Sequence, residues 1–238
     1  MNPTLSIFMP ICLRPEYTKI TLKSLADTTR HRKDIQYILV LDGDHTEETK
    51  DAIADFVGEF KDSTIVHEEQ THFGIRATTV TGMELSKGQF IQKIDNDLLF
   101  SDGWVEKMIK TLNKCPEIDV LKPNVRWGKK ASISSNVQYG TILGNGYIIS
   151  KFCQGGIWMI RRQTIEGHKF DKPRIRGRQR SNPLIDIPGL VYAWSTTVDF
   201  IHFGHRGGDH SLFINSKEHA EYYSWKAIAE MSKRSRQK

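Results

Sequence analysis

The chain has 238 residues, of which 38% are hydrophobic and 26% are charged, and its formal net charge is +6. This composition is that of an ordinary globular protein and excludes a disordered or fibrous chain. The longest apolar runs are too short to cross a bilayer, and the start of the chain shows no secretory signal, so we expect a cytoplasmic protein without a transmembrane segment.

Short apolar runs alternate with amphipathic segments over the first hundred residues. The apolar runs predict strands at residues 5–9, 37–41, 63–68 and 89–94. The segments between them have apolar residues at helical spacing and predict helices at residues 17–28, 46–60 and 75–86. Continuous apolar strands are typical of a parallel sheet that is covered on both faces. The alternation therefore predicts an α/β fold with a mostly parallel, twisted sheet flanked by helices.

The pattern changes after a further amphipathic helix at residues 102–113. The second half of the chain is predicted to be a smaller, β-containing region. Its expected elements are strands at 120–125, 157–160 and 197–203, a hairpin within 137–149, a short helix at 161–167, a basic loop at 174–183 and a helix at 217–232. A chain of this length fits one large domain, which we expect here.

Two acids follow the predicted fourth strand, Asp95 and Asp97, with Asn96 between them. Side chains two apart on a strand point to the same face, and ligands of open α/β sheets bind beyond the carboxyl ends of the strands. The chain has neither a Walker loop nor a G-x-G-x-x-G sequence, so the phosphates of a bound nucleotide would need a cation. Carboxylate oxygens suit Mg²⁺ or Mn²⁺. The alternative for this pair is a polar loop that begins the next helix.

Other polar residues fall at the ends of predicted strands. Asp42 can accept hydrogen bonds from a base or a ribose, or can be a turn aspartate before a glycine. Arg76 can pair with a phosphate or a carboxylate, or can be an exposed helix arginine. Three histidines lie close together, and one of them can complete a metal site and favour Mn²⁺ over Mg²⁺. They are His202, His205 and His210.

Five segments, taken in order, resemble nucleotide-sugar glycosyltransferases of the GT-A (Rossmann-like) fold, and glycosyltransferase family 2 in particular. They are SIFMPICLRPEYTKITLKSL, VLDGDHTEET, HFGIRATTVTGMELSKGQFIQKIDND, GGIWMIRRQTIEGHKFD and IHFGH. The resemblance covers about residues 4–206 and rests on the order of these elements. It implies transfer of a sugar from a nucleoside diphosphate sugar, with a UDP-sugar favoured, to a hydroxyl acceptor, assisted by Mn²⁺ or Mg²⁺ and with inversion.

The resemblance also implies roles for single residues. Asp97 is expected to bind the metal directly, with His205 as a further ligand and Asp95 near the ribose or the metal. Asp42 is expected to contact the nucleobase. The remaining implied positions are Pro10, Arg14, Arg76 and Asn96 at the nucleotide, and Gly156 and Trp158 beside the donor sugar and acceptor.

The catalytic base is where the chain departs from the family pattern. The family carries an acidic pair after the glycine-pair segment, whereas this chain has NPLIDIPGLVYAW there, with Asp186 alone. The resemblance therefore implies Asp186 as the general base, with Asp171 and Asp199 as competitors. The alternative for Asp186 is a helix N-cap, since a proline follows it by two residues.

On this reading, residues 1–115 form the nucleotide-sugar-binding half, residues 116–215 the acceptor-binding and catalytic half, and residues 216–238 a basic C-terminal helix or tail. Basic residues gather between 161 and 180, just before the predicted base, and can steer an anionic acceptor. The expected acceptor is a saccharide or a lipid-linked saccharide, with a hydroxylated base in DNA or RNA as the alternative. A non-catalytic module that binds a nucleotide or nucleic acid is the rival from another class.

Overall fold

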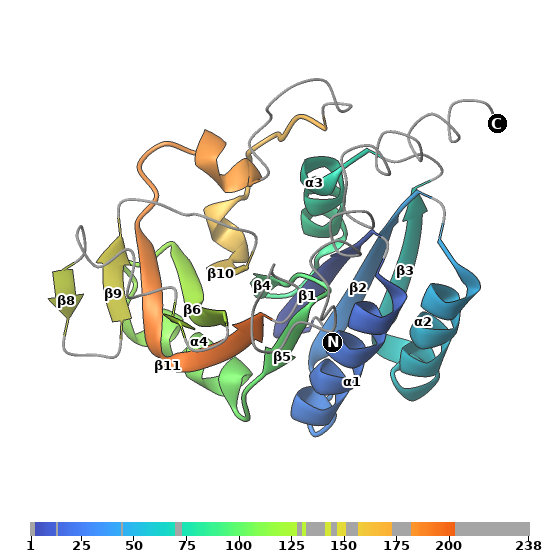
Figure 1. Cartoon of the computed structure of the whole chain (residues 1–238). Helices are drawn as coiled ribbons and strands as arrows, with labels where there is room; N and C mark the ends of the chain where they lie inside the picture. Colours follow the sequence, from blue (N-terminus) through green and yellow to red (C-terminus); the bar gives the residue numbers. More distant parts are fainter. Residues whose placement is uncertain are drawn as a thin grey trace.

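The structure, a computed structural model, describes residues 3–12, 14–43, 45–69, 73–127, 130–131, 141–143, 147–150, 157–172 and 182–202. Within these residues the strands form one 11-stranded sheet, whose main path runs β3-β2-β1-β4-β10-β6-β11-β9-β8, while β5 pairs with β11 and β7 with β6. Figure 1 shows this sheet curling from β3 to β8, with helices against its faces. No helix among the described residues is long and apolar enough to cross a membrane.

Four parallel strands and three helices build the first part of the sheet. The strands are β1 (Leu5–Ile11), β2 (Ile35–Asp42), β3 (Thr64–Glu69) and β4 (Phe90–Lys93). The helices are α1 (Pro15–Thr29), α2 (Glu47–Glu59) and α3 (Ile75–Leu85), with a short 3-10 turn η1 (Lys61–Ser63) before β3. Because β2, β1 and β4 run in parallel, their carboxyl ends meet at one edge of the sheet. The predicted α/β class and the parallel arrangement are confirmed.

The second part of the sheet mixes parallel and antiparallel pairs. Its strands are β5 (Leu98–Phe100), β6 (Val120–Trp127), β7 (Lys130–Ala131), β8 (Thr141–Leu143), β9 (Tyr147–Ser150), β10 (Trp158–Arg161) and β11 (Tyr192–His202). Its helical elements are α4 (Trp104–Lys114) and the 3-10 turns η3 (Arg162–Thr164) and η4 (Pro183–Asp186). Strand β10 is antiparallel to both β4 and β6, and β11 is parallel to β6, so β11 ends at the same edge as β4.

Three local predictions differ from the structure. β1 does not stop before Pro10 but continues to Ile11, because its ladder with β4 has already ended at the pair Phe8–Lys93 and a missing N–H is tolerated there. β11 begins at Tyr192, well before the predicted residue 197. The short helix expected at residues 161–167 is a single 3-10 turn. The helix predicted at 217–232 lies outside the described residues, and the boundaries between the two halves stay predictions.

The core has one cluster on each face of the sheet, as the alternation of strand side chains requires. One cluster joins Ile7 and Met9 of β1 to residues of α1, α2 and α4. The other joins Phe8 of β1 to residues of α3 and η4, such as Met83 and Leu184. Figure 1 shows α1 and α2 on one side of the parallel strands and α3 on the other. Both faces of β1, β2 and β4 are therefore covered, which explains their mostly apolar sequences, whereas the edge strand β3 is partly exposed.

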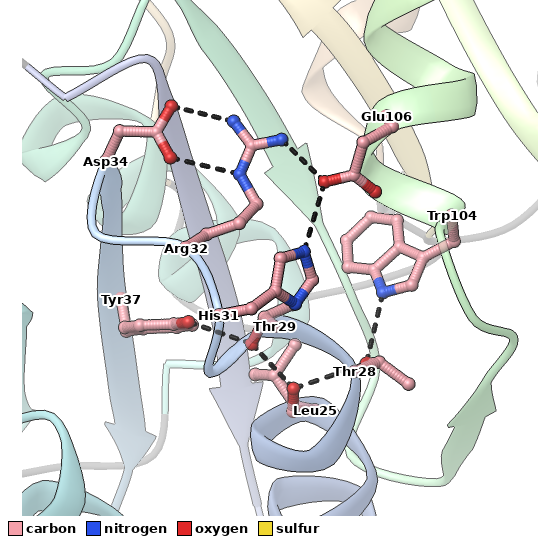
Figure 2. Close-up of polar contacts among 9 residues, drawn as sticks. All are labelled: Leu25, Thr28, Thr29, His31, Arg32, Asp34, Tyr37, Trp104 and Glu106. Carbon is pink, nitrogen blue, oxygen red and sulfur yellow. Dashed lines mark hydrogen bonds and ion pairs between the residues drawn. The ribbon is translucent and has the colours of Figure 1, made fainter.

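A polar network fastens the end of α1 to the start of β2 and the start of α4 (Figure 2). The planar fork of Arg32 donates from Nε and Nη2 to Asp34, at 3.0 and 2.7 Å, and from Nη1 to Glu106 at 2.9 Å. Beneath it the Tyr37 hydroxyl donates to Thr29 Oγ1 at 2.8 Å, and burial raises the pKa of Tyr37 to about 12. This network lies at the amino end of β2, whereas the acidic pair follows the carboxyl end of β4.

Candidate active site

The turn between β4 and β5 carries Asp95 and Asp97. Hydroxyl groups of α1 hold this turn in place. The Asn96 side chain donates to Thr18 Oγ1 at 3.0 Å, and the backbone N–H of Leu98 donates to Thr21 Oγ1 at 3.0 Å. Asn96 is buried, and its side chain stabilises the turn. Its predicted contact with a nucleotide stays a prediction.

The end of β11 brings a histidine to these acids. His202 is paired in register with Leu98 of β5, and its Nε2 lies 3.3 Å from Asp97 Oδ1. One ligand atom from each of Asp95, Asp97 and His202 lies within 4.8 Å of the others. His202 is the described histidine at this site. His205, the ligand implied by the resemblance, lies outside the described residues and stays a prediction.

The chemistry of this cluster suits a divalent cation. Asp97 Oδ1 is buried, and apart from the His202 ring nitrogen at 3.3 Å no described group is near enough and well enough aligned to compensate it. A buried carboxylate oxygen is costly unless it is compensated. Two carboxylates and an imidazole are ligands that Mn²⁺ accepts, and the carboxylates alone also suit Mg²⁺. Asp95, Asp97 and His202 therefore fit a metal ion of this class.

Two basic side chains also contact the acidic pair. Lys93 Nζ lies 2.5 Å from Asp95 Oδ1, and Arg14 forms an ion pair with Asp97 through Nη1 and Oδ2. Burial raises the pKa of Asp95, but the charge of Lys93 and its hydrogen bond lower it more, so that this pKa lies below its ordinary value. The lowered pKa keeps the Asp95 carboxylate ionised beside a cation.

The predicted base is held by an arginine. Arg76, in the first turn of α3, forms an ion pair with Asp186, the last residue of η4, and its Nε donates to the carbonyl oxygen of Asp171 at 3.3 Å. The N-cap alternative for Asp186 is wrong, because Asp186 is the last residue of η4 and no helix begins at residues 187–190, which follow it. The Asp186 side chain is 48% exposed, so a ligand can reach it.

Asp42 ties the end of β2 to the start of α3. Its Oδ1 accepts from the backbone N–H of Phe73 at 2.7 Å, and its Oδ2 accepts from that of Gly74 at 3.0 Å. Gly74 has φ 89°, a conformation that favours glycine, and precedes the first residue of the helix. The buried carboxylate thus positions the loop before α3, and its predicted contact with a nucleobase stays a prediction.

Other predicted site residues are not members of the cluster of Asp95, Asp97 and His202. Trp158 is fully buried in β10, with its ring centroid 5.6 Å from that of Phe8, so its side chain belongs to the core, and its predicted place beside the donor sugar stays a prediction. Pro10 is buried within β1. Asp199, a competitor for the base, accepts a hydrogen bond from Asn124. Gly156 lies outside the described residues, and its predicted role is untested.

Lys93 was missed by the sequence reasoning, although the sequence contains a signal for it. A lysine within the apolar run of β4 lies two residues before Asp95, and side chains two apart share a face of a strand. A lysine at such a position needs an anionic partner, because a buried, unpaired ammonium group is very costly. The residue two positions along the strand is the nearest candidate for that partner.

Comparisons with known proteins bear on the family and the fold of the chain. The family model described as "Glycosyl transferase family 2" matches residues 6–168. A curated relative, "Putative glycosyltransferase EpsH" of Bacillus subtilis (strain 168), is 25% identical over 186 residues, which are 74% of this chain and 52% of the relative. The chain therefore spans about half the length of that relative.

Two solved structures share the fold. The crystal structure of GalNAc-T7 with UDP, GalNAc and Mn²⁺ matches with a TM-score of 0.67 and 14% identity, over 84% of this chain and 44% of that one. The crystal structure of residues 1–349 of S. aureus TarS matches with a TM-score of 0.67 and 12% identity, over 84% of this chain and 60% of that one. At these identities the likeness concerns the fold alone.

Proposed function

Because the chain belongs to glycosyl transferase family 2 and has the GT-A fold, we propose that it is a glycosyltransferase whose donor is a nucleoside diphosphate sugar, with a UDP-sugar favoured. The observation that carries this proposal is the cluster of Asp95, Asp97 and His202 just beyond the carboxyl end of β4. Ligands of α/β sheets bind at this edge, and the cluster would hold the cation that a diphosphate needs where no glycine-rich phosphate loop is present.

The donor half of the reaction would depend on this cluster. Asp97 and His202, with Asp95 beside them, would hold Mn²⁺ or Mg²⁺. A bound cation supplies Lewis-acid stabilisation of the negative charge that develops on the leaving diphosphate. The structure solved for GalNAc-T7 contains UDP and Mn²⁺, which supports the same pairing here. Arg14, which already lies on Asp97, would present its guanidinium to the diphosphate as well.

The acceptor half would depend on Asp186. The acceptor oxygen attacks the anomeric carbon, the bond from that carbon to the diphosphate breaks, and the hydroxyl proton passes to the Asp186 carboxylate. Arg76 orients this carboxylate through the ion pair. A single displacement of this kind inverts the configuration at the anomeric carbon. We expect a saccharide or a lipid-linked saccharide as the acceptor, with a hydroxylated nucleic-acid base as the alternative.

The experiment that tests this proposal measures the release of UDP from common UDP-sugars in the presence of Mn²⁺, with and without saccharide acceptors. The wild type should release UDP from at least one donor, and the release should stop when a chelator removes the metal. An Asp97→Ala variant should lose both the release and the Mn²⁺-dependent binding of UDP. Metal-dependent binding of UDP that is unchanged in this variant would contradict the assignment of the metal site.

A further inference from the structure

Each acid of the metal cluster already has a cationic partner from the chain itself. Lys93 Nζ lies 2.5 Å from Asp95 Oδ1, and the Arg14 guanidinium contacts Asp97 Oδ2. Among the described residues, the charges of these two cationic groups balance those of the two carboxylates. A divalent cation that approached the protein alone would find little net attraction, and it would compete with Arg14 for Asp97.

Lys93 cannot easily leave its partner. The side chain is 2% exposed, and residue 93 lies in register between Phe8 of β1 and Trp158 of β10, two aromatic residues of the core. An ammonium group that is buried in this way needs an anion at hydrogen-bonding distance. Asp95 is therefore a permanent partner of Lys93, and Asp97 and His202 remain as the main ligands for a metal.

Arg14 is placed differently. It is the one residue other than glycine with positive φ in the part of the chain that the structure describes, with φ 67° and ψ 57°, and it is the N-cap of α1. Such a backbone conformation costs free energy and is found mainly where the surroundings or the function maintain it. The Arg14 side chain is 20% exposed, so its fork can exchange Asp97 for another anion. A diphosphate is a suitable replacement anion, since two phosphate oxygens can accept bidentate hydrogen bonds from one guanidinium group.

We propose that Lys93 and Arg14 are internal counter-ions of the acidic pair, which keep metal binding weak until a nucleoside diphosphate arrives with the cation. This inference rests on the proposed function and deepens it. The negative charge of the diphosphate balances the positive charge that the divalent cation adds to the site. It also attracts the Arg14 guanidinium and draws it away from Asp97. The oxygen that Arg14 releases becomes a ligand for the cation. The metal and the nucleotide thus bind cooperatively because of two side chains that are not metal ligands.

Calorimetric titration of Mn²⁺ into the protein, with and without UDP, tests the proposal. The wild type should bind Mn²⁺ weakly alone and much more tightly with UDP. Lys93→Met keeps a long side chain but removes the counter-ion, so Mn²⁺ affinity without UDP should rise roughly tenfold or more, because an opposing charge close to the site is lost. Lys87→Met removes the same charge from an exposed lysine before β4, and this control should leave the Mn²⁺ affinity unchanged.

Arg14→Gln provides a second variant that does not disturb the core, should Lys93→Met fail to fold when checked by circular dichroism. It should raise the affinity for Mn²⁺ alone and lower the affinity for UDP in the presence of Mn²⁺. If Arg14 served folding alone, the substitution would leave the affinity for Mn²⁺ alone unchanged or reduce it. The opposite signs of the two changes therefore separate a counter-ion from a merely structural residue.

Two results would overturn the proposal, and they differ in what else they affect. If the folded variants bind Mn²⁺ alone no better than the wild type, while the wild type still binds it tightly with UDP, the counter-ion role is wrong and the proposed metal site stands. If the wild type fails to bind Mn²⁺ even with UDP, the metal site of the proposed function is wrong, and the counter-ion role is wrong with it.

Discussion

Arg76, in the first turn of α3, forms an ion pair with Asp186 at the end of η4, 110 residues later in the chain. The arginine side chain is 11% exposed and the aspartate side chain 48% exposed. The partly buried guanidinium thus fixes the position of a carboxylate that solvent and ligands can still reach. This arrangement suits a base that must meet an acceptor hydroxyl in a defined geometry.

Asp186→Asn should retain donor binding and lose transfer. The amide has nearly the same shape but cannot take the acceptor proton, so kcat should fall by about 100-fold or more, while the Kd for UDP with Mn²⁺ should stay unchanged. Steady-state kinetics and calorimetry measure the two quantities. Asp171→Asn is the matched control, because Arg76 contacts the backbone of Asp171 and the side chain is exposed. A larger loss of kcat in the control would assign the base to Asp171 instead.

Arg76→Lys distinguishes two roles for the arginine. Lysine keeps the charge but lacks the planar fork, so the carboxylate of Asp186 should be less well oriented. We expect kcat to fall by about tenfold or more, with the affinity for UDP unchanged. The resemblance implies instead that Arg76 lines the nucleotide pocket. In that case the substitution would raise the Kd for UDP. A fall in kcat alone would assign Arg76 to the orientation of Asp186, and a rise in Kd would assign it to the nucleotide pocket.

The network around Arg32 should make stability depend on acid pH. Bonding to Arg32 lowers the pKa of Asp34, and for Glu106 the effect of Arg32 and other hydrogen bonds outweighs burial, so that its pKa is lowered too. Carboxylates with lowered pKa values stabilise the fold above their ordinary pKa, and this stabilisation is lost as pH falls through the folded-state pKa. The unfolding free energy should therefore decrease below about pH 4.

Glu106→Gln tests this dependence. At pH 7 the variant should be less stable than the wild type by under about 1 kcal/mol, because the carboxylate is 47% exposed and solvent screens the pair. At an acid pH below the lowered pKa of Glu106 the difference should largely vanish, since both side chains are then uncharged. Urea unfolding at the two pH values measures this. Glu47→Gln, at an 81% exposed site, is the control and should change stability little at either pH. An equal loss at both pH values would contradict the electrostatic origin.

Gly82→Ala should destabilise the protein through the contact between α3 and β1. A Cβ at this position would clash with the ring of Phe8, so the helix must shift, at a cost of about 1–3 kcal/mol. Gly58→Ala in α2 is the matched control, because a Cβ there meets nothing within 4 Å. Alanine is the better helix former, so the control should be neutral or up to about 1 kcal/mol more stable. Thermal unfolding of both variants compares them, and equal Tm values would contradict the predicted clash.

The sequence alone determined the parallel half of the sheet and the family. The runs 37–41 and 89–94 predicted buried strands, because a strand covered on both faces must be apolar at every position. The helices between them followed from apolar residues at helical spacing. These signals are local, since each depends on neighbours within a few residues. A local signal of the same kind, an apolar run followed directly by two acids, indicated Asp95 and Asp97 as an acidic pair at a strand end.

Only the tertiary structure decided which partners surround the acidic pair. His202 lies beside Asp97 because β11 pairs with β5, and the register of β11 shifts between Trp194 and Asp199. Such a shift changes which residues stand opposite one another, and nothing in the local pattern of a strand encodes it. The residues alone left three histidines open and the resemblance implied His205, whereas the described histidine beside Asp97 is His202.

The ion pairs of the site were also beyond the sequence. Arg14 and Asp97 are 83 residues apart, and Arg76 and Asp186 are 110 residues apart. Each pair joins a helix N-terminus to a turn near another strand or helix, and the distance between such elements depends on how the whole sheet curls and packs. The periodicity of a sequence indicates which face of an element is buried. It does not indicate which charged side chain of a distant element lies opposite, because that choice is made by packing and register.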